Sequence, residues 1–296
     1  MIDFLRYRFA IASVSLLILV GALGTYIYKE KTYGQAFKYS IDFTGGTQVL
    51  LRFAQPVNIE QLKGVLDQAG WSGAITREFS ATEVLVRVRD FVNDANGLGV
   101  KIQQALVAAM PENPASILQS EAVGAGVGAE LRWNAIMAVL VALLALLVYI
   151  ALSFWSVAFA VGAVIALAHD ALVMLSFYLL FDREISITGI GAILAVLGYS
   201  INDTIVIFSS IRSHIKKSHG ASLYHVVNAS INQTLRRTLL TSFSTLLTVV
   251  PMFVLGGEAL RDFTLTLLIG IIFGTYSSIY IASPVMMLLY KQKKAA

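Results

Sequence analysis

The sequence contains no cysteine, and only 14% of its 296 residues are charged, against about 25% in an ordinary soluble domain. The missing thiols exclude disulfides, cysteine-bound zinc, iron–sulfur clusters and thiol nucleophiles. The four histidines show no HExxH spacing of the kind found in zinc hydrolases. We therefore expect no metal site and no cofactor. We also expect no enzyme, because no nucleophile, base and orienting group occur at a suitable spacing.

Apolar residues take the place of the missing charges. They make up 57% of the chain, and the mean hydropathy is +0.73. This composition excludes a soluble protein and predicts a polytopic membrane protein in contact with membrane lipid. Residues 29–130 carry a net charge of −2, and the rest of the chain carries +6. Basic residues thus concentrate around the apolar segments, as in positive-inside membrane proteins and unlike a surface that binds nucleic acid.

Six long apolar segments predict a membrane all-α bundle of six transmembrane helices. The first, Phe9 to Tyr28, exceeds the 7 to 15 apolar residues typical of a cleaved signal peptide, so we expect an uncleaved anchor. Five more follow: Asn134 to Phe154, Trp155 to Phe181, Ile185 to Ile211, Thr238 to Leu255 and Phe263 to Tyr290. The expected regions are residues 1–28 (tail and first helix), 29–131 (one extracytoplasmic domain) and 132–296 (five-helix bundle with a basic cytoplasmic loop, 209–237).

The basic residues also predict the orientation. The 209–237 segment contains five basic residues and no acidic one, and the C-terminal end of the chain carries Lys291, Lys293 and Lys294. Both belong on the cytoplasmic side by the positive-inside rule. An even number of spans then places the N-terminus, with Arg6 and Arg8, in the cytoplasm as well. Residues 29–131 are therefore expected outside.

The segment between the first two spans has ordinary polarity and reads as a small α+β domain. Val84, Val86 and Val88 alternate with Leu85, Arg87 and Arg89, which predicts a strand with one buried and one solvated face. The expected strands are Lys38 to Phe43, Thr47 to Phe53, Trp71 to Phe79, Thr82 to Arg89 and one near Ile117, and the expected helices are Asn58 to Ala69 and Leu98 to Met110. Their order predicts a ferredoxin-like plan.

Few ionisable side chains interrupt the apolar segments, and each costs about 2.5 to 3.5 kcal/mol near the bilayer centre. They are Asp170 beside His169, Asp203 beside Asn202, and Arg237. Arg237 can be a flanking residue that snorkels to the interface, and the two aspartates can be helix glue. These structural interpretations stay open beside a functional one.

A row of polar residues in the fifth span favours the functional interpretation. The row comprises Arg237, Thr241, Ser244, Thr245 and Thr248, spaced so as to share one helical face. A helix starting near Ser230 places Arg237 about 10 Å along its axis, near the expected depth of Asp203. We expect an ion pair between them, beside a seam that holds water. Burial favours the neutral acid and Arg237 favours the carboxylate, so Asp203 is predicted to be a proton switch.

Four runs resemble the SecF family of bacterial Sec translocase subunits, in the resistance-nodulation-division superfamily, and the resemblance covers essentially the whole chain. They are Tyr39-Ser-Ile-Asp-Phe-Thr-Gly-Gly-Thr47, Val127-Gly-Ala-Glu-Leu131, Gly198-Tyr-Ser-Ile-Asn-Asp-Thr-Ile-Val206 and Leu235-Arg-Arg-Thr-Leu-Leu-Thr-Ser242. The resemblance implies a partner of SecD in the bacterial inner membrane. It also implies use of the proton motive force to assist late export of unfolded polypeptides through SecYEG.

By the same resemblance Asp203 and Arg237 are proton-relay groups, and we add Asp170 as a candidate third member. The extracytoplasmic motif comprises Asp42, Phe43, Gly45 and Gly46. Two places depart from the family pattern: Phe208-Ser-Ser-Ile-Arg212 replaces Phe-Asp-Arg-Ile-Arg, and Gly124-Ala125 replaces Gly-Pro. Two other functions remain open at this stage, a structural scaffold without proton coupling and half of a small-molecule exporter.

Overall fold

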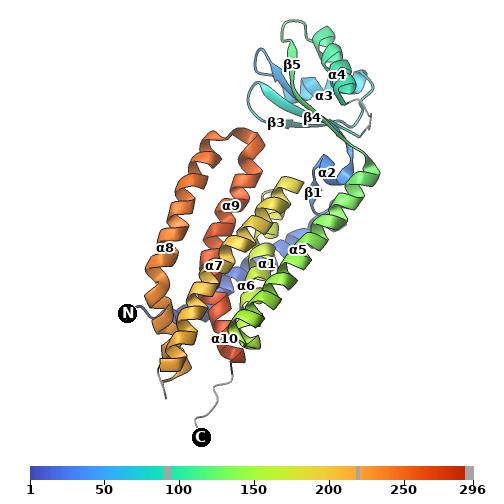
Figure 1. Ribbon diagram of the computed structural model, residues 1–296. Coiled ribbons are helices and arrows are strands. Elements are labelled where there is room, and N and C mark those ends of the chain that lie inside the picture. The colour runs from blue at the N-terminus through green and yellow to red at the C-terminus, as the bar shows by residue number, and fades with distance from the viewer. Residues whose placement is uncertain (90–94, 218–220, 291–296) are drawn as a thin grey trace. The chain divides into compact units, whose positions relative to one another are not determined.

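The computed structural model describes residues 1–89, 95–217 and 221–290. The chain divides into two compact units. A helical unit comprises Met1–Lys38, Met137–Gly256 and Leu260–Ala296, and an α+β unit comprises Tyr39–Ile136 and Gly257–Ala259. Figure 1 shows the helices and strands of both units.

Among the described residues, six helices are long and apolar enough to cross a membrane, which confirms the predicted number of spans. They are built from the 3-10 turn η1 (Leu5–Tyr7) with α1 (Arg8–Tyr33), α5 (Ala125–Phe154), α6 (Val157–Leu180), α7 (Ile187–Lys217), α8 (Leu223–Leu255), and the last span, which joins α9 (Gly257–Ser277), the π-helical turn η2 (Ser278–Ala282) and α10 (Ser283–Leu289). Pro251 lies inside α8, and Pro284 lies at the start of α10.

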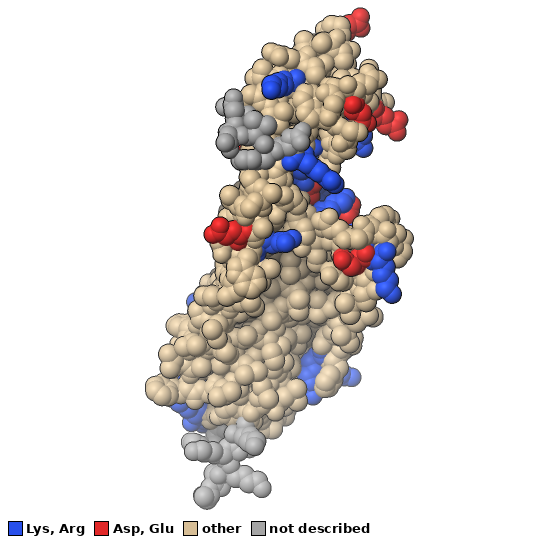
Figure 2. All heavy atoms as spheres, turned by 90° about the vertical axis from the view of Figure 1, so that its right-hand side faces the viewer, with Lys and Arg blue, Asp and Glu red and all other residues tan. Residues whose placement is uncertain are grey.

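Helix α6 is the centre of the helical unit. It packs against α1, α7, η2 and α10, and α7 packs in turn against α8. In its most apolar stretch 67% of the residues are buried, against 6% in α5 and 17% in α8. The outer faces of α5 and α8 are lined by leucine, valine and aromatic side chains, as lipid contact requires. Figure 2 shows the broad middle of this unit almost free of charged residues on the face drawn.

The prediction of a loop over residues 209–237 is wrong, because two helices extend into this segment. Helix α7 runs to Lys217, and α8 begins at Leu223, capped by the Ser222 hydroxyl, which accepts from the His225 backbone N–H at 3.4 Å. Residues 218–220 lie outside the described residues. The apolar pattern marks only the part of each helix that contacts lipid, whereas the basic and polar residues beyond it also favour helix.

The α+β unit has the predicted ferredoxin-like plan. Its elements run β2 (Gly46–Phe53), α3 (Ile59–Gln68), β3 (Ile75–Glu78), β4 (Glu83–Val88), α4 (Ala95–Ala109) and β5 (Ala115–Val123). The sheet order is β3-β4-β2-β5, and all neighbouring strands are antiparallel. Val84, Val86 and Val88 lie in the core, as their alternation predicts, together with Leu62 of α3 and Ile102 of α4.

Two local predictions in this unit are wrong. Lys38 to Phe43 is not one strand, because β1 ends at Tyr39 and a helical turn, α2 (Ile41–Thr44), follows. The Thr44 hydroxyl donates to the Ser40 carbonyl at 3.1 Å, a local bond that competes with strand pairing. Arg87, expected on a solvated face, is only 9% exposed, and its guanidinium donates to the Tyr39 carbonyl at 3.1 Å. The residues before β2 therefore cover this part of the sheet.

Candidate functional site

Asp203 lies on the buried stripe of α7. Val196, Ser200, Asp203 and Ile207 recur at helical spacing, and all four are buried. Asp203 is 6% exposed, and its Oδ2 atom is buried without a hydrogen-bond partner. The Thr238 hydroxyl of α8 faces the same carboxylate and is also buried without a hydrogen bond of normal geometry. A carboxyl oxygen and a hydroxyl thus meet between two membrane-spanning helices with unused bonding capacity.

Arg237 directly precedes Thr238 on α8. Its side chain is exposed, and in the described part of the chain it makes no ion pair with Asp203 within 4.0 Å. Successive helical residues point about 100° apart, so with Thr238 turned toward α7, Arg237 lies on the flank of α8. The expected ion pair is therefore not closed in this structure.

The predicted polar seam does not line the Asp203 site. Asn202, Thr241, Ser244 and Thr248 are exposed, and only Thr245 is half-buried, with its hydroxyl 3.5 Å from that of Tyr199. The hydroxyls on α8 mainly bond to carbonyls of their own helix, as Ser244 does with Leu240 at 2.7 Å. The buried polar face of α8 consists instead of Ser230, Thr234, Thr238 and Ser242. Both sets repeat about every four residues, so spacing alone does not tell them apart.

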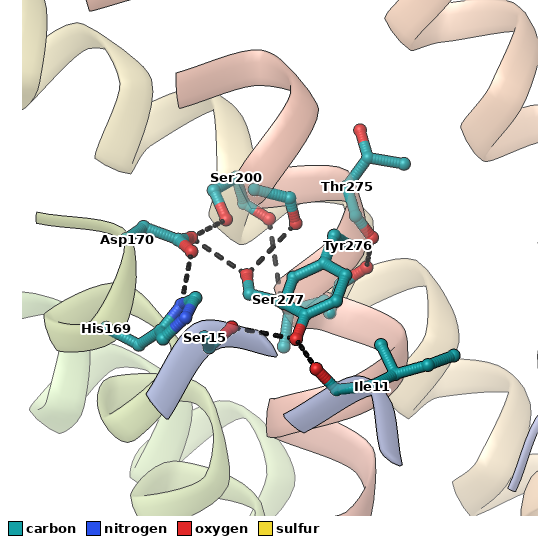
Figure 3. A network of polar contacts seen from close by, with 11 residues as sticks. Ile11, Ser15, His169, Asp170, Ser200, Thr275, Tyr276 and Ser277 are labelled. Carbon is teal, nitrogen blue, oxygen red and sulfur yellow. Dashed lines mark hydrogen bonds and ion pairs between the residues drawn. The ribbon is translucent and has the colours of Figure 1, made fainter. Parts of the chain in front are cut away.

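Asp170 of α6 is completely buried and lies at the centre of a second polar cluster (Figure 3). Its Oδ1 atom is 3.1 Å from Nδ1 of the adjacent His169. Its Oδ2 atom accepts hydrogen bonds from Ser200 of α7, at 2.7 Å, and from Ser277 of α9, at 2.9 Å. The carboxyl group therefore joins three membrane-spanning helices.

Tyr276 extends this cluster toward the first span. Its ring centre lies 6.0 Å from that of His169, and its hydroxyl is 2.7 Å from both the Ser15 hydroxyl and the Ile11 carbonyl of α1. The preceding residue, Thr275, lies 2.6 Å from Ser242 of α8 through their hydroxyls. Sequence reasoning missed these partners, because serine, threonine and tyrosine are common in apolar helices. The only signal in the sequence was that several hydroxyl side chains are expected at about the same depth in the membrane as Asp170 and Asp203.

The last span changes its winding beside Asp170. The π-helical turn η2 begins at Ser278, directly after Ser277, and the Ser283 hydroxyl donates to the Ser278 carbonyl at 2.9 Å. Such turns are rare and often lie at functional sites. Gly274, one turn earlier, lets α9 approach α7, since an added Cβ would lie 2.9 Å from Cβ of Ser200.

In the α+β unit, the predicted motif requires both of its glycines. Gly45 and Gly46 have φ of +73° and +115°, which disfavours any side chain. A Cβ at Gly45 would lie 2.7 Å from the Ala125 Cα atom, and one at Gly46 would lie 2.6 Å from the Val88 carbonyl oxygen. Phe43 is buried, and Asp42 accepts from the Ser40 hydroxyl at 2.8 Å. The motif is thus a tightly packed turn that joins α2 to β2.

Comparisons with known proteins match this chain over most of its length. Residues 102–292 match the family model "Protein export membrane protein SecD/SecF, C-terminal", and residues 34–57 match "SecD/SecF GG Motif". The protein translocase subunit SecF of Pseudomonas aeruginosa is 39% identical, over 97% of this chain and 91% of that protein. The SecF of Escherichia coli O157:H7 is 35% identical, over 95% of this chain and 85% of that protein.

A solved structure agrees with the fold. The crystal structure of SecDF from Thermus thermophilus, described as a translocon-associated membrane protein, superposes with a TM-score of 0.84 at 38% identity. The similarity covers 96% of this chain but 38% of that one. The chain studied here therefore corresponds to one part of a longer relative.

Proposed function

This chain belongs to the SecD/SecF family of protein export membrane proteins, and from that premise we propose that it couples the proton motive force to late steps of preprotein translocation. In this proposal it acts together with SecD, and the polypeptides move through SecYEG. The observation that carries the proposal is the buried Asp203 carboxyl with an unpartnered oxygen, held between α7 and α8 within reach of the Arg237 charge.

The energies involved are of comparable size. Placing a carboxylate near the bilayer centre costs about 2.5 to 3.5 kcal/mol. Moving one charge through the full membrane potential yields about 2.3 kcal/mol per 100 mV. One proton that crosses the membrane through Asp203 therefore supplies free energy comparable to the cost of changing the charge of this site. Protonation and deprotonation can then bias two packings of the same helices.

The charged and neutral states of Asp203 differ in which side chain of α8 faces α7. With Asp203 charged, the carboxylate attracts Arg237, and a small rotation of α8 brings the guanidinium inward. With Asp203 neutral, Arg237 is released and Thr238 faces the acid. Helix α8 is bonded to α9 through Ser242 and Thr275, and α1 and α5 flank the α+β unit in the chain. Movement of α8 thus has a bonded route into the rest of the bundle.

A row of four exposed polar side chains on α7 and α8 supports SecD as the partner within the membrane. Asn202, Thr241, Ser244 and Thr248 are exposed on α7 and α8 in the chain alone. Polar side chains in membrane helices usually face other helices or a water-filled cavity. In the Thermus relative one chain carries this part within a longer SecDF protein. We infer that SecD helices cover this row, with Arg237 at its edge.

The α+β unit is proposed to contact exported polypeptide. Its sheet ends in two edge strands, β3 and β5, and Ile75 and Leu118 on these edges are 51% and 41% exposed. Extended chains commonly add to such edges through backbone hydrogen bonds, without a deep pocket. The proposal places this unit outside the membrane and both chain termini in the cytoplasm, as the charge distribution predicts.

The proposal is tested by reconstituting SecYEG vesicles with SecD and this chain, then imposing or collapsing a proton gradient. Completion of export by a trapped preprotein should rise only when the chain, SecD and the gradient are all present. The matched control omits the chain while keeping SecD and the gradient. An equal rise with the gradient collapsed would favour a scaffold without proton coupling, and no rise under any condition would reject a role in late export.

A further inference from the structure

We propose that His169 and Asp170 form a second proton-binding site in the helical unit, separate from Asp203 and located where α6, α7 and α9 meet. The site takes its proton at Nε2 of His169, and Asp170 orients the imidazole. This inference extends the proposed proton coupling, and the functional consequence of the second site rests on that proposal. The site itself is argued from its own geometry.

The carboxyl group of Asp170 is fully engaged by neighbours. It receives the Ser200 and Ser277 hydroxyls on Oδ2, while Oδ1 lies at hydrogen-bond distance from Nδ1 of His169. When Asp170 is ionised, it only accepts hydrogen bonds, and the ring proton lies on Nδ1. In that state Asp170 fixes both the tautomer and the orientation of the imidazole, as carboxylates do for functional histidines elsewhere.

The inference depends mainly on the other ring nitrogen of His169, Nε2. Nε2 of His169 is buried and has no hydrogen-bond partner, although the residue as a whole is 8% exposed. With Nδ1 protonated, Nε2 has a free lone pair and is an acceptor. A buried acceptor without a partner costs free energy in an apolar bundle, and a bound proton or water removes that cost. A purely structural histidine would be expected to use both nitrogens.

The neighbours of the pair are uncharged. In the described part of the chain, no Lys, Arg, Glu or other Asp forms an ion pair with His169 or Asp170. Among the described residues, the titratable group recorded against the pair from another helix is Tyr276 of α9. The other polar groups recorded in contact with the pair are the hydroxyls of Ser200 of α7 and Ser277 of α9, and the Ser15 hydroxyl of α1 contacts Tyr276. The charge of the pair is therefore set by its own protons.

The hydroxyls of Ser200 and Ser277 link the pair to α7 and to the start of η2. Ser200 precedes Asp203 by three residues on α7, so the two side chains lie one helical turn apart. The single hydroxyl proton of Ser277 has two acceptors within reach, Asp170 at 2.9 Å and the Gly274 carbonyl at 3.1 Å. A proton added to the pair weakens the hold of Asp170 on both serines. That change acts directly on the Asp203 helix and on the start of the π-helical turn.

The test is nitrogen NMR of a chain in which His169 is the only histidine. Gln replaces the other three histidines, His214, His219 and His225, and the 15N-histidine-labelled chain is titrated in lipid bilayers. We expect the Nε2 resonance to move between its unprotonated and protonated positions as the pH falls. Asp170→Asn removes the carboxylate acceptor at Nδ1 and should change the pH at which this resonance moves.

Two further variants keep the test decisive. Ser200→Ala with Ser277→Ala removes both donors to Oδ2 while keeping the carboxylate, and it should displace the midpoint even if Asp170→Asn fails to fold. Asp203→Asn should leave the His169 titration in place, so failure of the Asp203 proposal is distinguishable. Two results would overturn the second site. One is a resonance that stays fixed at every pH where the chain is folded, and the other is a midpoint that is unchanged both by Asp170→Asn and by Ser200→Ala with Ser277→Ala.

Discussion

Ser200 of α7 donates a 2.7 Å hydrogen bond to Asp170 of α6 and stands one helical turn before Asp203. The two buried acids of the bundle are thus connected through one serine and one turn of helix. This relationship makes α7 the element on which both proposed proton sites act. Because α7 also packs against α8, we expect a change at either acid to alter the packing of the helix that carries Arg237.

The first prediction concerns orientation. Because the chain has no cysteine, single cysteines at Ser80 and Ser218 can be probed in intact cells with a thiol reagent that does not cross the membrane. We expect label at position 80, in the α+β unit, and none at position 218, because the basic residues around 218 favour the cytoplasm. Both positions should label after the cells are opened. Label at 218 but not at 80 in intact cells would reverse the topology.

The second prediction concerns the two motif glycines. Gly45→Val together with Gly46→Val should abolish export, because both residues have positive φ and an added Cβ would overlap the backbone at Ala125 and Val88. The measurement is preprotein export at matched membrane levels of the chain. The matched control is Gly64→Val, since no atom lies within 4 Å of a Cβ built there. Wild-type export by the double variant would show that the turn tolerates side chains.

The third prediction concerns Asp182, in the turn between α6 and α7. Its carboxylate pairs with Lys38 and Lys29, which lowers its pKa below the ordinary value. The pair therefore stabilises the fold above the ordinary carboxyl pKa, about 3.9, and this contribution is lost as the pH falls through the lower folded value. Asp182→Asn should cost less than about 1 kcal/mol at neutral pH, because the group is half exposed.

Thermal unfolding in detergent measures this effect. The difference between Asp182→Asn and wild type should shrink below about pH 4, as the wild-type carboxylate becomes protonated. The same loss of stability at all pH values would show that Asp182 acts through packing and not through its charge.

The fourth prediction concerns the shape of the Arg237 cation. Arg237→Lys keeps the positive charge but loses the planar fork that binds both oxygens of a carboxylate. We expect a decrease in gradient-driven export on the order of ten-fold or less, and a larger decrease for Arg237→Ala. The neighbouring exposed residue provides the control, Arg236→Lys, which should export like wild type. Equal export by Arg237→Ala and wild type would remove Arg237 from the proton-responsive pair.

Patterns that follow from one helix or strand were predictable from sequence. The six spans, the alternating valines of β4 and the start of helix α3 at Asn58, whose Oδ1 accepts from the Glu60 N–H at 2.8 Å, are all confirmed. Each depends on composition or spacing within a single element. Position 203 could also be selected from the sequence as a candidate site, because an acid in an apolar span is costly wherever the helix faces.

What depended on helix rotation or on distant partners was not predictable. Polar residues repeat on two faces of α8, and only packing shows that Thr238 faces α7 while Thr241 does not. The Ser200 and Ser277 contacts with Asp170 join residues 30 and 107 positions apart, and no local pattern indicates them. Arg87 was expected to be solvated because alternation describes one strand and says nothing of the segment that covers it.

The most direct test of the central claim is the response of Asp203→Asn to the proton gradient. Asn has the shape of the neutral acid but cannot take up or release a proton. In SecYEG vesicles with SecD, this variant should complete export at the rate that wild type shows without a gradient, whether or not the gradient is imposed. Its amount in the membrane and its association with SecD should match wild type and the control variant Asp182→Asn. Asp203→Asn vesicles that respond to the gradient as wild type does would contradict the account.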